Sequence, residues 1–285
     1  MAKRKFSLHL TVLALACFCL LTFSANWPLK VHSQSPPTAI AQIHFATPPE
    51  AAPAFARREE SRSRCPCYSS SQPLTALIPA SNLALTATAH PTFFLYVPHA
   101  TGDGKTTNHA VDREQFEVEF ELADQQQQRV YQTTFNIVST PGIVSFTLPA
   151  TAPPLEPQKY YHWYFEVICD RDDRSGDSVV SGWSRRVELT PTQVQALAQA
   201  SPLEKPRIYA QAGLWHDLLA TIAELRRPQP GNPLLGVVWV ELLKSVGLEK
   251  VAQEPLVNCC TQPTEETGDR SMMLKDRPLK KETGC

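Results

Sequence analysis

The stretch that decides the fold is residues 155–169, LEPQKYYHWYFEVIC. From Tyr161 to Cys169 every second residue is aromatic or apolar, with one face of the pattern formed by Tyr161, Trp163, Phe165, Val167 and Cys169. This period of two predicts a long strand with one buried face. A charged stretch, residues 170–177 (DRDDRSGD), separates it from a second run over residues 178–189, so the two runs predict a hairpin.

The turn before this strand has a recognisable pattern, Leu155-x-Pro157-x-x-x-Tyr161, which leads into Trp163. It resembles the tyrosine corner of fibronectin type III and related immunoglobulin-like domains. In those domains a tyrosine at the start of a late strand hydrogen-bonds back over the corner. The alternative is a proline-ended loop before an aromatic strand.

Further strands are predicted on the N-terminal side of this corner. Residues 93–97 form an apolar and aromatic run between two prolines, as a strand buried on both faces would. In residues 116–122, Phe, Val and Leu alternate with Glu, and residues 129–135 are a plausible partner across the turn at 124–128. Residues 143–148 are another short run. Short strands separated by turns predict a β-sandwich over residues 65–190.

The pattern changes to helix after Leu189. Thr190 is a typical N-cap and Pro191 a typical first helical residue, which predicts a helix over 191–200. The i, i+3, i+4 spacing of apolar residues over 208–225 predicts two helices broken at Gly213, and the stripe over 234–246 predicts another. Residues 191–256 are therefore expected to form a helical subdomain.

Gly213-Leu214 and Gly247-Leu248 lie 34 residues apart, which is the tetratricopeptide period. Tyr209 and Pro230 then fall on the aromatic and the closing-proline positions of such a repeat. We predict tetratricopeptide-like hairpins, the alternative being an ordinary helical appendage. The predicted fold class is α+β: an immunoglobulin/fibronectin-III-like β-sandwich followed by tetratricopeptide-like α-helical hairpins.

The N-terminus predicts export. Lys3, Arg4 and Lys5 precede an apolar stretch over residues 6–23, the arrangement of a signal peptide. We expect residues 1–33 to be this signal, cleaved before Gln34, with an uncleaved anchor as the alternative and no membrane span after the signal is removed. The expected location is the periplasm or the outside of the cell.

The composition excludes one class of partner and indicates where the folded domain begins and ends. Lys and Arg (27) balance Asp and Glu (28), so no global basic field exists to hold nucleic acid. The 25 prolines are about twice the usual share. Residues 34–64, rich in Pro, Ala, Ser and Gln, are expected to be a disordered linker, and residues 257–285 a disordered tail.

Export permits disulfides. We predict that Cys169 pairs with Cys65 or Cys67, which would tie the incoming chain to the sheet and close a loop of about 100 residues. The alternative is that Cys65 and Cys67 are free or separately paired.

Chemical motifs are scarce. HExxH, GxSxG, GxxxxGK[ST] and GxGxxG are absent from the sequence, so we expect no catalytic residues and no cofactor. Four carboxylates, those of Asp170, Asp172, Asp173 and Asp177, could hold calcium, but a solvated hairpin turn with internal Asp–Arg pairing is the favoured interpretation. For His216-Asp217, adjacent residues on a helix diverge, so a helix-start aspartate and a surface histidine are expected.

Several stretches together resemble the cyanobacterial family called domain of unknown function nine-two-eight, over roughly residues 57–252. They are LTALIP (74–79), PTFFLYVP (91–98), GIVSFTLP (142–149), WYFEVICDRDDRSGD (163–177), GWSRRV (182–187) and residues 209–226 and 245–248. The resemblance implies export to a cyanobacterial cell envelope and names no activity.

These observations favour a non-enzymatic envelope module that binds an unknown envelope protein or a glycan. The alternatives are a calcium-dependent adhesion or structural protein, and a hydrolase that uses the loop at residues 170–177.

Overall fold

A computed structural model describes residues 43–53, 72–98, 115–138, 141–169, 171–172 and 174–257. The chain divides into two units, residues 1–36 and 37–285, and all the described residues belong to the second. The predicted signal peptide lies outside the described residues, as does the predicted tail beyond residue 257.

One sheet has three strands in the order β1-β3-β6, all antiparallel. These are β1 (Thr75–Ala76), β3 (Thr92–Val97) and β6 (Gly142–Thr147). The run PTFFLYVP becomes β3, the central strand, and five of its six residues are buried. A central strand covered on both faces needs apolar side chains on both faces, which explains the unbroken apolar run.

The second sheet has five strands in the order β2-β8-β7-β4-β5. They are β2 (Leu83–Thr86), β4 (Gln115–Asp124), β5 (Arg129–Val138), β7 (Tyr160–Ile168) and β8 (Ser178–Arg186). All neighbours are antiparallel except β2, which runs parallel to β8. The predicted hairpin of β7 with β8 and the pairing of β4 with β5 are both confirmed.

The two sheets meet through aromatic side chains. Phe120 of β4 packs against Phe146 of β6 with ring centroids 4.6 Å apart, and Phe93 of β3 lies 5.3 Å from Trp163 of β7. These rings are almost fully buried, and aromatic pairs at such distances stabilise a core beyond the area that they bury. The alternation in β4 thus places Phe and Val inside, while its glutamates lie on the outer face.

The corner before β7 has the predicted local contact. The hydroxyl of Tyr161 accepts a hydrogen bond from the backbone N–H of Glu156 at 3.0 Å. Leu155 is fully buried beside it, and its own N–H donates to the carbonyl oxygen of Ala89 at 2.9 Å. The tyrosine therefore fixes the turn from which β7 starts.

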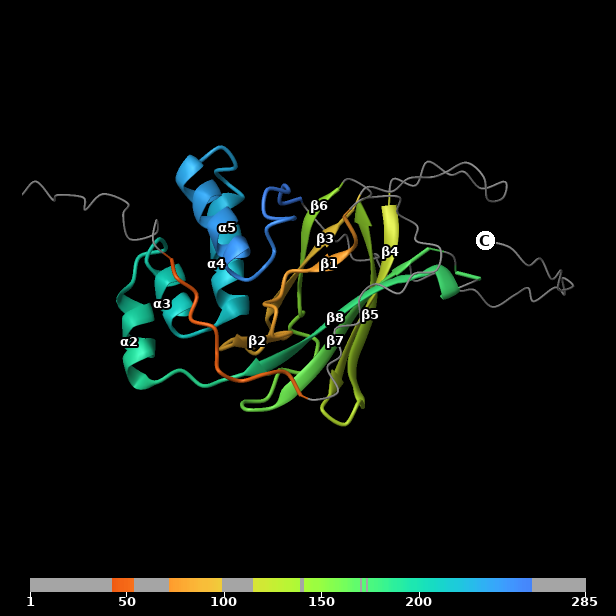
Figure 1. The fold of residues 1–285 in the computed structure, drawn as a ribbon. Helices are drawn as coiled ribbons and strands as arrows, with labels where there is room; N and C mark the ends of the chain where they lie inside the picture. The colour runs from red at the N-terminus through yellow and green to blue at the C-terminus, as the bar shows by residue number, and fades with distance from the viewer. Residues whose placement is uncertain are drawn as a thin grey trace, which may run out of the picture. The chain divides into compact units, whose positions relative to one another are not determined.

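Helices follow the strands, as predicted. They are α2 (Pro191–Gln199), α3 (Lys205–Gln211), α4 (Trp215–Arg226) and α5 (Pro233–Ser245). Thr190 caps α2 in a capping box with Gln193, which confirms the predicted helix start. The helix α4 packs against β2 and β3 (Figure 1). Nε1 of Trp215 donates to the carbonyl oxygen of Leu77 at 2.8 Å.

Gly213 and Gly247 end α3 and α5 in the same way. Their φ angles are +69° and +85°, and each is followed by a leucine whose N–H donates back five residues, to Tyr209 and to Leu243. This is the Schellman pattern that favours glycine. The two turns are therefore equivalent as helix ends. Only the first leads into a second helix, because turns occupy residues 249–253, so the expected second hairpin lacks its second helix.

Residues 43–53 pack on the fold, and the expectation of a disordered linker is wrong for this part of residues 34–64. Phe45 is 4% exposed and its ring lies 5.0 Å from that of Trp215. The N–H of Ala46 donates to the carbonyl oxygen of Ala210 at 3.0 Å. A lone phenylalanine in a segment rich in Pro and Ala gives no periodic signal, which is why the pattern was misleading. We call residues 43–53 the N-terminal strap.

The last described residues return to the three-stranded sheet. Leu256 forms a parallel bridge with Ile143 of β6, with hydrogen bonds from Ile143 N–H to Pro255 O (2.7 Å) and from Val257 N–H to Ile143 O (2.9 Å). Gly142 permits this approach, because a Cβ there would lie 2.7 Å from Val257. Residue 257 thus belongs to the fold and not to the predicted tail.

The chain is therefore an α+β protein, which confirms the predicted α+β class. Among the described residues, the helices are all too short or too polar to cross a bilayer.

Candidate functional site

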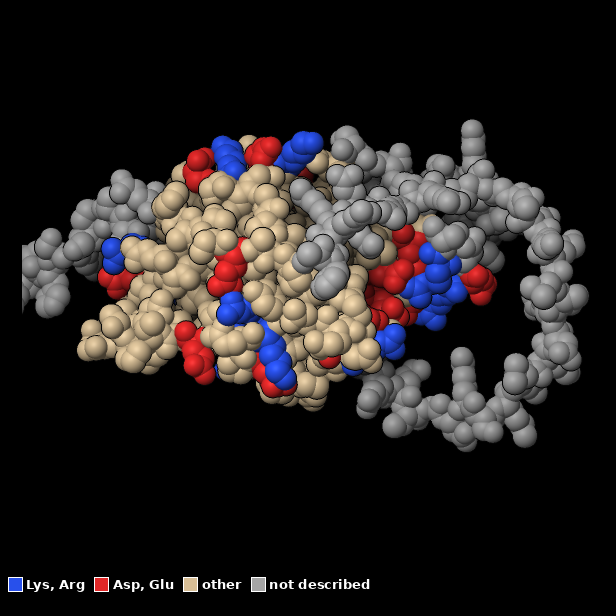
Figure 2. Space-filling model, turned by 60° about the horizontal axis from the view of Figure 1, so that its bottom comes forward, with Lys and Arg blue, Asp and Glu red and all other residues tan. Residues whose placement is uncertain are grey.

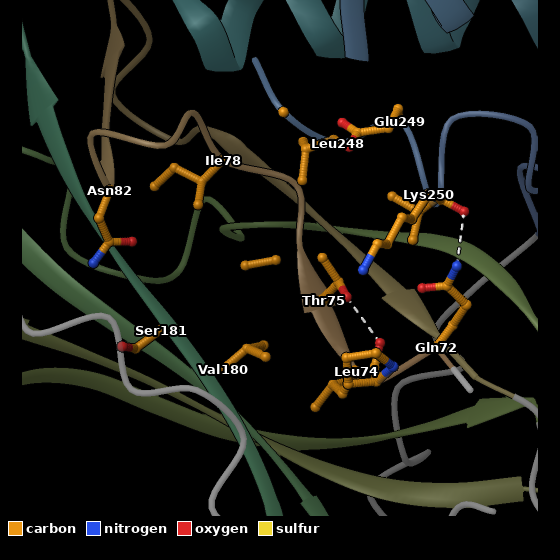
Figure 3. Close-up of a pocket in the computed structure, with 14 residues that line it drawn as sticks. Gln72, Leu74, Thr75, Ile78, Asn82, Val180, Ser181, Leu248, Glu249 and Lys250 are labelled. Carbon is orange, nitrogen blue, oxygen red and sulfur yellow. Dashed lines mark hydrogen bonds between the residues drawn. The ribbon is translucent and has the colours of Figure 1, made fainter. Parts of the chain in front are cut away.

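A pocket of about 600 Å³ lies between the edge of β1, the middle of β8 and the turn that follows α5. A volume of this size is typical of small-ligand sites. Figure 3 shows Asn82 and Ser181 on one side of it and Gln72 and Lys250 on the other. The lining residues are 72–76, Ile78, Asn82, Val180, Ser181 and 247–251.

Asn82 closes one end of this pocket, immediately before β2. Its φ is +55°, a left-handed conformation that asparagine adopts more readily than most residues. The N–H of Asn82 donates to Pro79 O at 2.8 Å, and its carbonyl oxygen accepts the N–H of Trp183 at 3.0 Å. The turn therefore holds the amide side chain beside β8.

Two polar atoms of the pocket have no hydrogen-bond partner among the described residues: Nδ2 of Asn82 and Oγ of Ser181. Asn82 is 7% exposed and Ser181 is 8% exposed. Leaving a buried donor unsatisfied costs about 1–3 kcal/mol. The pocket is thus suited to an occupant that offers hydrogen-bond acceptors to these two groups.

The rim and the floor of the pocket differ in character. At the rim, Nε2 of Gln72 donates to the carbonyl oxygen of Lys250 at 3.3 Å, and the hydroxyl of Thr75 donates to Pro73 O at 2.8 Å (Figure 3). The floor is apolar, formed by Leu74, Ile78, Val180 and Leu248. Glu249 and Lys250 are the titratable side chains of the lining, and neither adjoins a nucleophile paired with a histidine.

A serine–histidine pair does occur, but in the interior. The hydroxyl of Ser184 in β8 lies 2.7 Å from Nε2 of His216 in α4, and Nδ1 of the same ring lies 3.1 Å from the carbonyl oxygen of Thr92. His216 is 5% exposed and Ser184 is fully buried, so the predicted surface histidine is wrong. Burial lowers the pKa of His216 to about 4. A pair without access to solvent is structural.

Asp217 is the expected helix-start aspartate, but it caps a loop of the sheets. Its carboxylate accepts from the N–H of Ala87 at 3.0 Å and from the hydroxyl of Thr88 at 2.7 Å. Burial raises its pKa, and these hydrogen bonds act in the opposite direction. His216 and Asp217 diverge on the helix, as predicted, and each joins α4 to a different part of the sheets.

Where it is described, the acidic loop has one internal ion pair, Arg174 with Asp177, and its arginines also pair with glutamates of β4 and β7. Asp177 is buried; one of its oxygens accepts the N–H of Cys169 at 2.8 Å and the other bonds Nε of Arg174. Arg174 also lies 3.2 Å from Glu166, and Arg171 lies 2.7 Å from Glu117. Both oxygens of Asp177 are thus engaged in holding the hairpin turn.

Of the other calcium candidates, the structure describes Asp172. Asp170 and Asp173 lie outside the described residues, and Asp172 is exposed. Within the part of the chain that the structure describes, no three His, Cys, Asp or Glu side chains form a group able to hold a metal ion. Calcium binding at this loop stays a prediction.

Cys169 lies at the end of β7, half-buried, with Sγ 3.1 Å from the carbonyl oxygen of Gly176. Cys65 and Cys67 lie outside the described residues, so the predicted disulfide also stays a prediction.

Charged residues on the visible face in Figure 2 lie in mixed groups of both signs, without a continuous basic surface. On the outer face of the five-stranded sheet, Glu121 pairs with Arg129 at 3.1 Å in the same manner as the pairs of the acidic loop. Exposed pairs of this kind each contribute about 0–1 kcal/mol.

Comparison with known proteins places the chain in a family. The family model for the Domain of Unknown Function DUF928 matches residues 56–256. The chain belongs to the DUF928 family. Curated proteins give no match. The DUF928 match covers the pocket and both sheets, whereas the N-terminal strap precedes it.

Sequence reasoning missed the pocket of this DUF928 domain. Asn82 and Ser181 are 99 positions apart and belong to different strands or turns, so no local spacing links them. The one usable signal was the asparagine after Pro79, Ala80 and Ser81, because such a sequence favours a turn that ends in a left-handed residue.

Proposed function

We propose that this protein is an exported, non-enzymatic binding module of the cell envelope that holds a protein or glycan partner. The observation that carries the proposal is the pocket between β1 and β8, because two buried polar groups in it, on Asn82 and Ser181, have no hydrogen-bond partner in the described part of the chain. Such groups fit a site that is completed by a ligand.

The proposed architecture also favours binding. We infer that the two sheets are an immunoglobulin-like sandwich, with β4, β7 and β8 in the places of its strands C, F and G. The strand order β8-β7-β4 and the hydrogen bond from Glu156 N–H to the Tyr161 hydroxyl support this inference. The equivalent Schellman turns at Gly213 and Gly247 support a tetratricopeptide-like origin of the helices. Function is argued from the pocket, since a fold alone does not imply it.

Two further observations support a non-enzymatic role and export. Ser184 and His216, the pair with a catalytic appearance, are sealed in the interior between β8, β3 and α4. The basic residues Lys3, Arg4 and Lys5 before an apolar stretch support export.

Binding assays on the full chain test the proposal. The probes are an array of bacterial cell-envelope glycans and a phage-displayed library of 12-residue peptides. We compare the unaltered protein with the double variant Asn82→Gly, Ser181→Ala, because glycine keeps the left-handed turn while removing the amide. The matched control is Asn136→Ala in β5, the strand at the opposite edge of the same sheet.

We expect at least one glycan or peptide to bind, and to bind at least tenfold more weakly to the double variant than to the control. Binding to neither class of probe, or equal binding to the double variant and the control, would contradict the proposal.

A further inference from the structure

We propose that the pocket receives an extended segment of a partner polypeptide, which adds as a strand to the open edge of β8 beside residues 178–182. The inference rests on the proposed function and specifies its partner as a peptide strand.

The open edge follows from the register of β2. This strand begins at Leu83, which is opposite Trp183 of β8, so β2 covers β8 only from Trp183 to Arg186. Residues 178–182 of β8 pair with β7 on their other side. Across residues 178–182, no described strand is paired with β8 on the side of β2.

The main chain of this edge is oriented for pairing. The N–H of Trp183 points to the β2 side, because it donates to Asn82 O at 3.0 Å. Main-chain groups of successive residues in a strand face opposite sides, so those of Ser181 and Val179 face the same side as those of Trp183. They form a short ladder of donors and acceptors in line with β2, and unpaired strand edges are templates for another strand.

Buried polar side chains near this edge also have unused hydrogen-bonding capacity. Within the part of the chain that the structure describes, Nδ2 of Asn82 and the Oγ atoms of Ser178 and Ser181 are buried without a hydrogen-bond partner. Asn82 caps one end of the edge, and Ser178 begins β8 at the other. A peptide carbonyl is an acceptor of the kind that the amide of Asn82 requires. The groups on Asn82 and Ser181 line the pocket beside the open edge.

The opposite wall favours a peptide over a sugar. It is β1, an edge strand of the three-stranded sheet whose backbone approaches that of β8, so an incoming strand would pair with the edge of β8 alone. None of the residues that line the pocket is aromatic, so a sugar ring would find no aromatic face on which to stack. Addition of a strand to a sheet edge is a common mode of peptide recognition, in which main-chain hydrogen bonds provide much of the affinity.

The experiment uses peptides selected from the 12-residue phage library against the full chain. Each selected peptide is also synthesised with N-methyl groups at alternate residues, which keeps its side chains but removes the N–H donors of one edge. The protein variant is Val179→Pro, since proline at this position removes an N–H that faces the open side and leaves the β7 pairing intact. Hydrogen exchange of the backbone amides of Val179 and Ser181 reports strand addition directly.

We expect selected peptides to slow exchange at Val179 and Ser181 at least tenfold. We also expect binding to fall at least tenfold both with Val179→Pro and with one of the two N-methylation patterns. If Val179→Pro does not fold, the methylated peptides and the exchange data on the unaltered protein decide the question.

Three results would overturn the inference: no peptide is selected, both methylated forms bind as well as the parent peptide, or exchange slows at β5 instead of β8. Glycan binding that depends on Asn82 and Ser181, without peptide binding, would overturn this inference and leave the proposed function standing.

Discussion

The Ser184 hydroxyl lies 2.7 Å from Nε2 of His216, and this hydrogen bond joins the five-stranded sheet to the first turn of α4. Because Nδ1 of the ring faces the carbonyl oxygen of Thr92 at 3.1 Å, a neutral imidazole with its proton on Nδ1 satisfies both contacts. A protonated ring would present a second N–H to Ser184 and would place a charge in the interior. The contact is therefore stable only while His216 is neutral.

This dependence predicts a loss of stability in acid. Burial lowers the pKa of His216 to about 4, below the 6.5 of an unperturbed histidine, so between these values the unfolded state binds the extra proton. The contribution of His216 is complete above about pH 6.5 and decreases by about 1.4 kcal/mol per pH unit as the pH falls towards 4. Urea unfolding at pH 7, 6 and 5 measures it.

The variant His216→Gln isolates this contribution. Burial also lowers the pKa of His162 to about 4, so His162 keeps a similar pH dependence in the variant. Asp217, whose pKa is raised by burial, acts in the opposite sense in both proteins. We therefore expect a shallower fall for His216→Gln than for the unaltered protein. Parallel pH profiles would show that His216 does not titrate on unfolding.

Replacing Ser184 tests the hydrogen bond between Ser184 and His216 by removing the serine hydroxyl group. Ser184→Ala leaves Nε2 of His216 buried without a donor, which should lower the free energy of unfolding by about 1–3 kcal/mol. Thr192→Ala, on the exposed helix α2, is the control and should stay within about 0.5 kcal/mol of the unaltered protein. Urea unfolding at pH 7 compares the two, and equal midpoints would refute the role of the contact.

The two turn glycines should respond differently to alanine. At Gly247 a Cβ meets nothing within 4 Å, so Gly247→Ala should cost only about 1 kcal/mol for the left-handed backbone. At Gly213 a Cβ would lie 2.9 Å from the carbonyl oxygen of Ala46, so Gly213→Ala should cost about 1–3 kcal/mol more by displacing the N-terminal strap.

Thermal unfolding and limited proteolysis separate these two effects. Gly213→Ala alone should accelerate cleavage within residues 43–53. Equal cleavage rates in the two alanine variants would mean that the strap does not depend on the close approach at Gly213.

The acidic loop should depend on one carboxylate. Asp177→Ala removes the acceptor of the Cys169 N–H and the partner of Arg174, and should lower the free energy of unfolding by about 1–3 kcal/mol. Asp172→Asn, at an exposed position, should change it by less than about 0.5 kcal/mol. Melts with calcium and with chelator should coincide. A calcium-dependent rise in Tm that Asp172→Asn abolishes would instead establish a calcium site.

The disulfide prediction is tested by non-reducing peptide mapping of native, air-exposed protein. We expect a peptide containing Cys169 to be linked to one containing Cys65 or Cys67. In the entropic model such a link would stabilise the fold by up to about 4.7 kcal/mol. A map in which Cys169 is linked to neither of these residues would show that the prediction is wrong.

The strands and the helix starts could be predicted because their signals are local. The alternation from Phe116 to Leu122 lies within β4, and Thr190 caps α2. The parallel strand β2 escaped prediction because it has only four residues, LALT, too few and too poor in aromatic and β-branched side chains to stand out as a strand. Its partner β8 is also about 100 positions away in the chain.

The candidate site escaped prediction for a related reason. Its unpartnered groups belong to Asn82 and Ser181, which are ordinary surface residues by composition and become buried only in the folded arrangement of the two sheets. His216 was likewise taken for a surface residue, because its partners Ser184 and Thr92 come from two strands that are not adjacent in the sequence. Contacts between strands distant in the sequence determine whether such residues are buried, and local patterns in a single sequence do not reveal those contacts.

The bridge between Ile143 and Leu256 has a consequence for biosynthesis. The two residues are separated by 113 positions, so β6 emerges from the ribosome long before the segment that covers its edge. Until residue 257 is made, a nascent chain presents that edge uncovered, and uncovered edges are sites of misassociation between chains. The last few residues of the folded part thus protect the edge of β6. A gene truncated just before them would encode every helix and strand but would yield an aggregation-prone product.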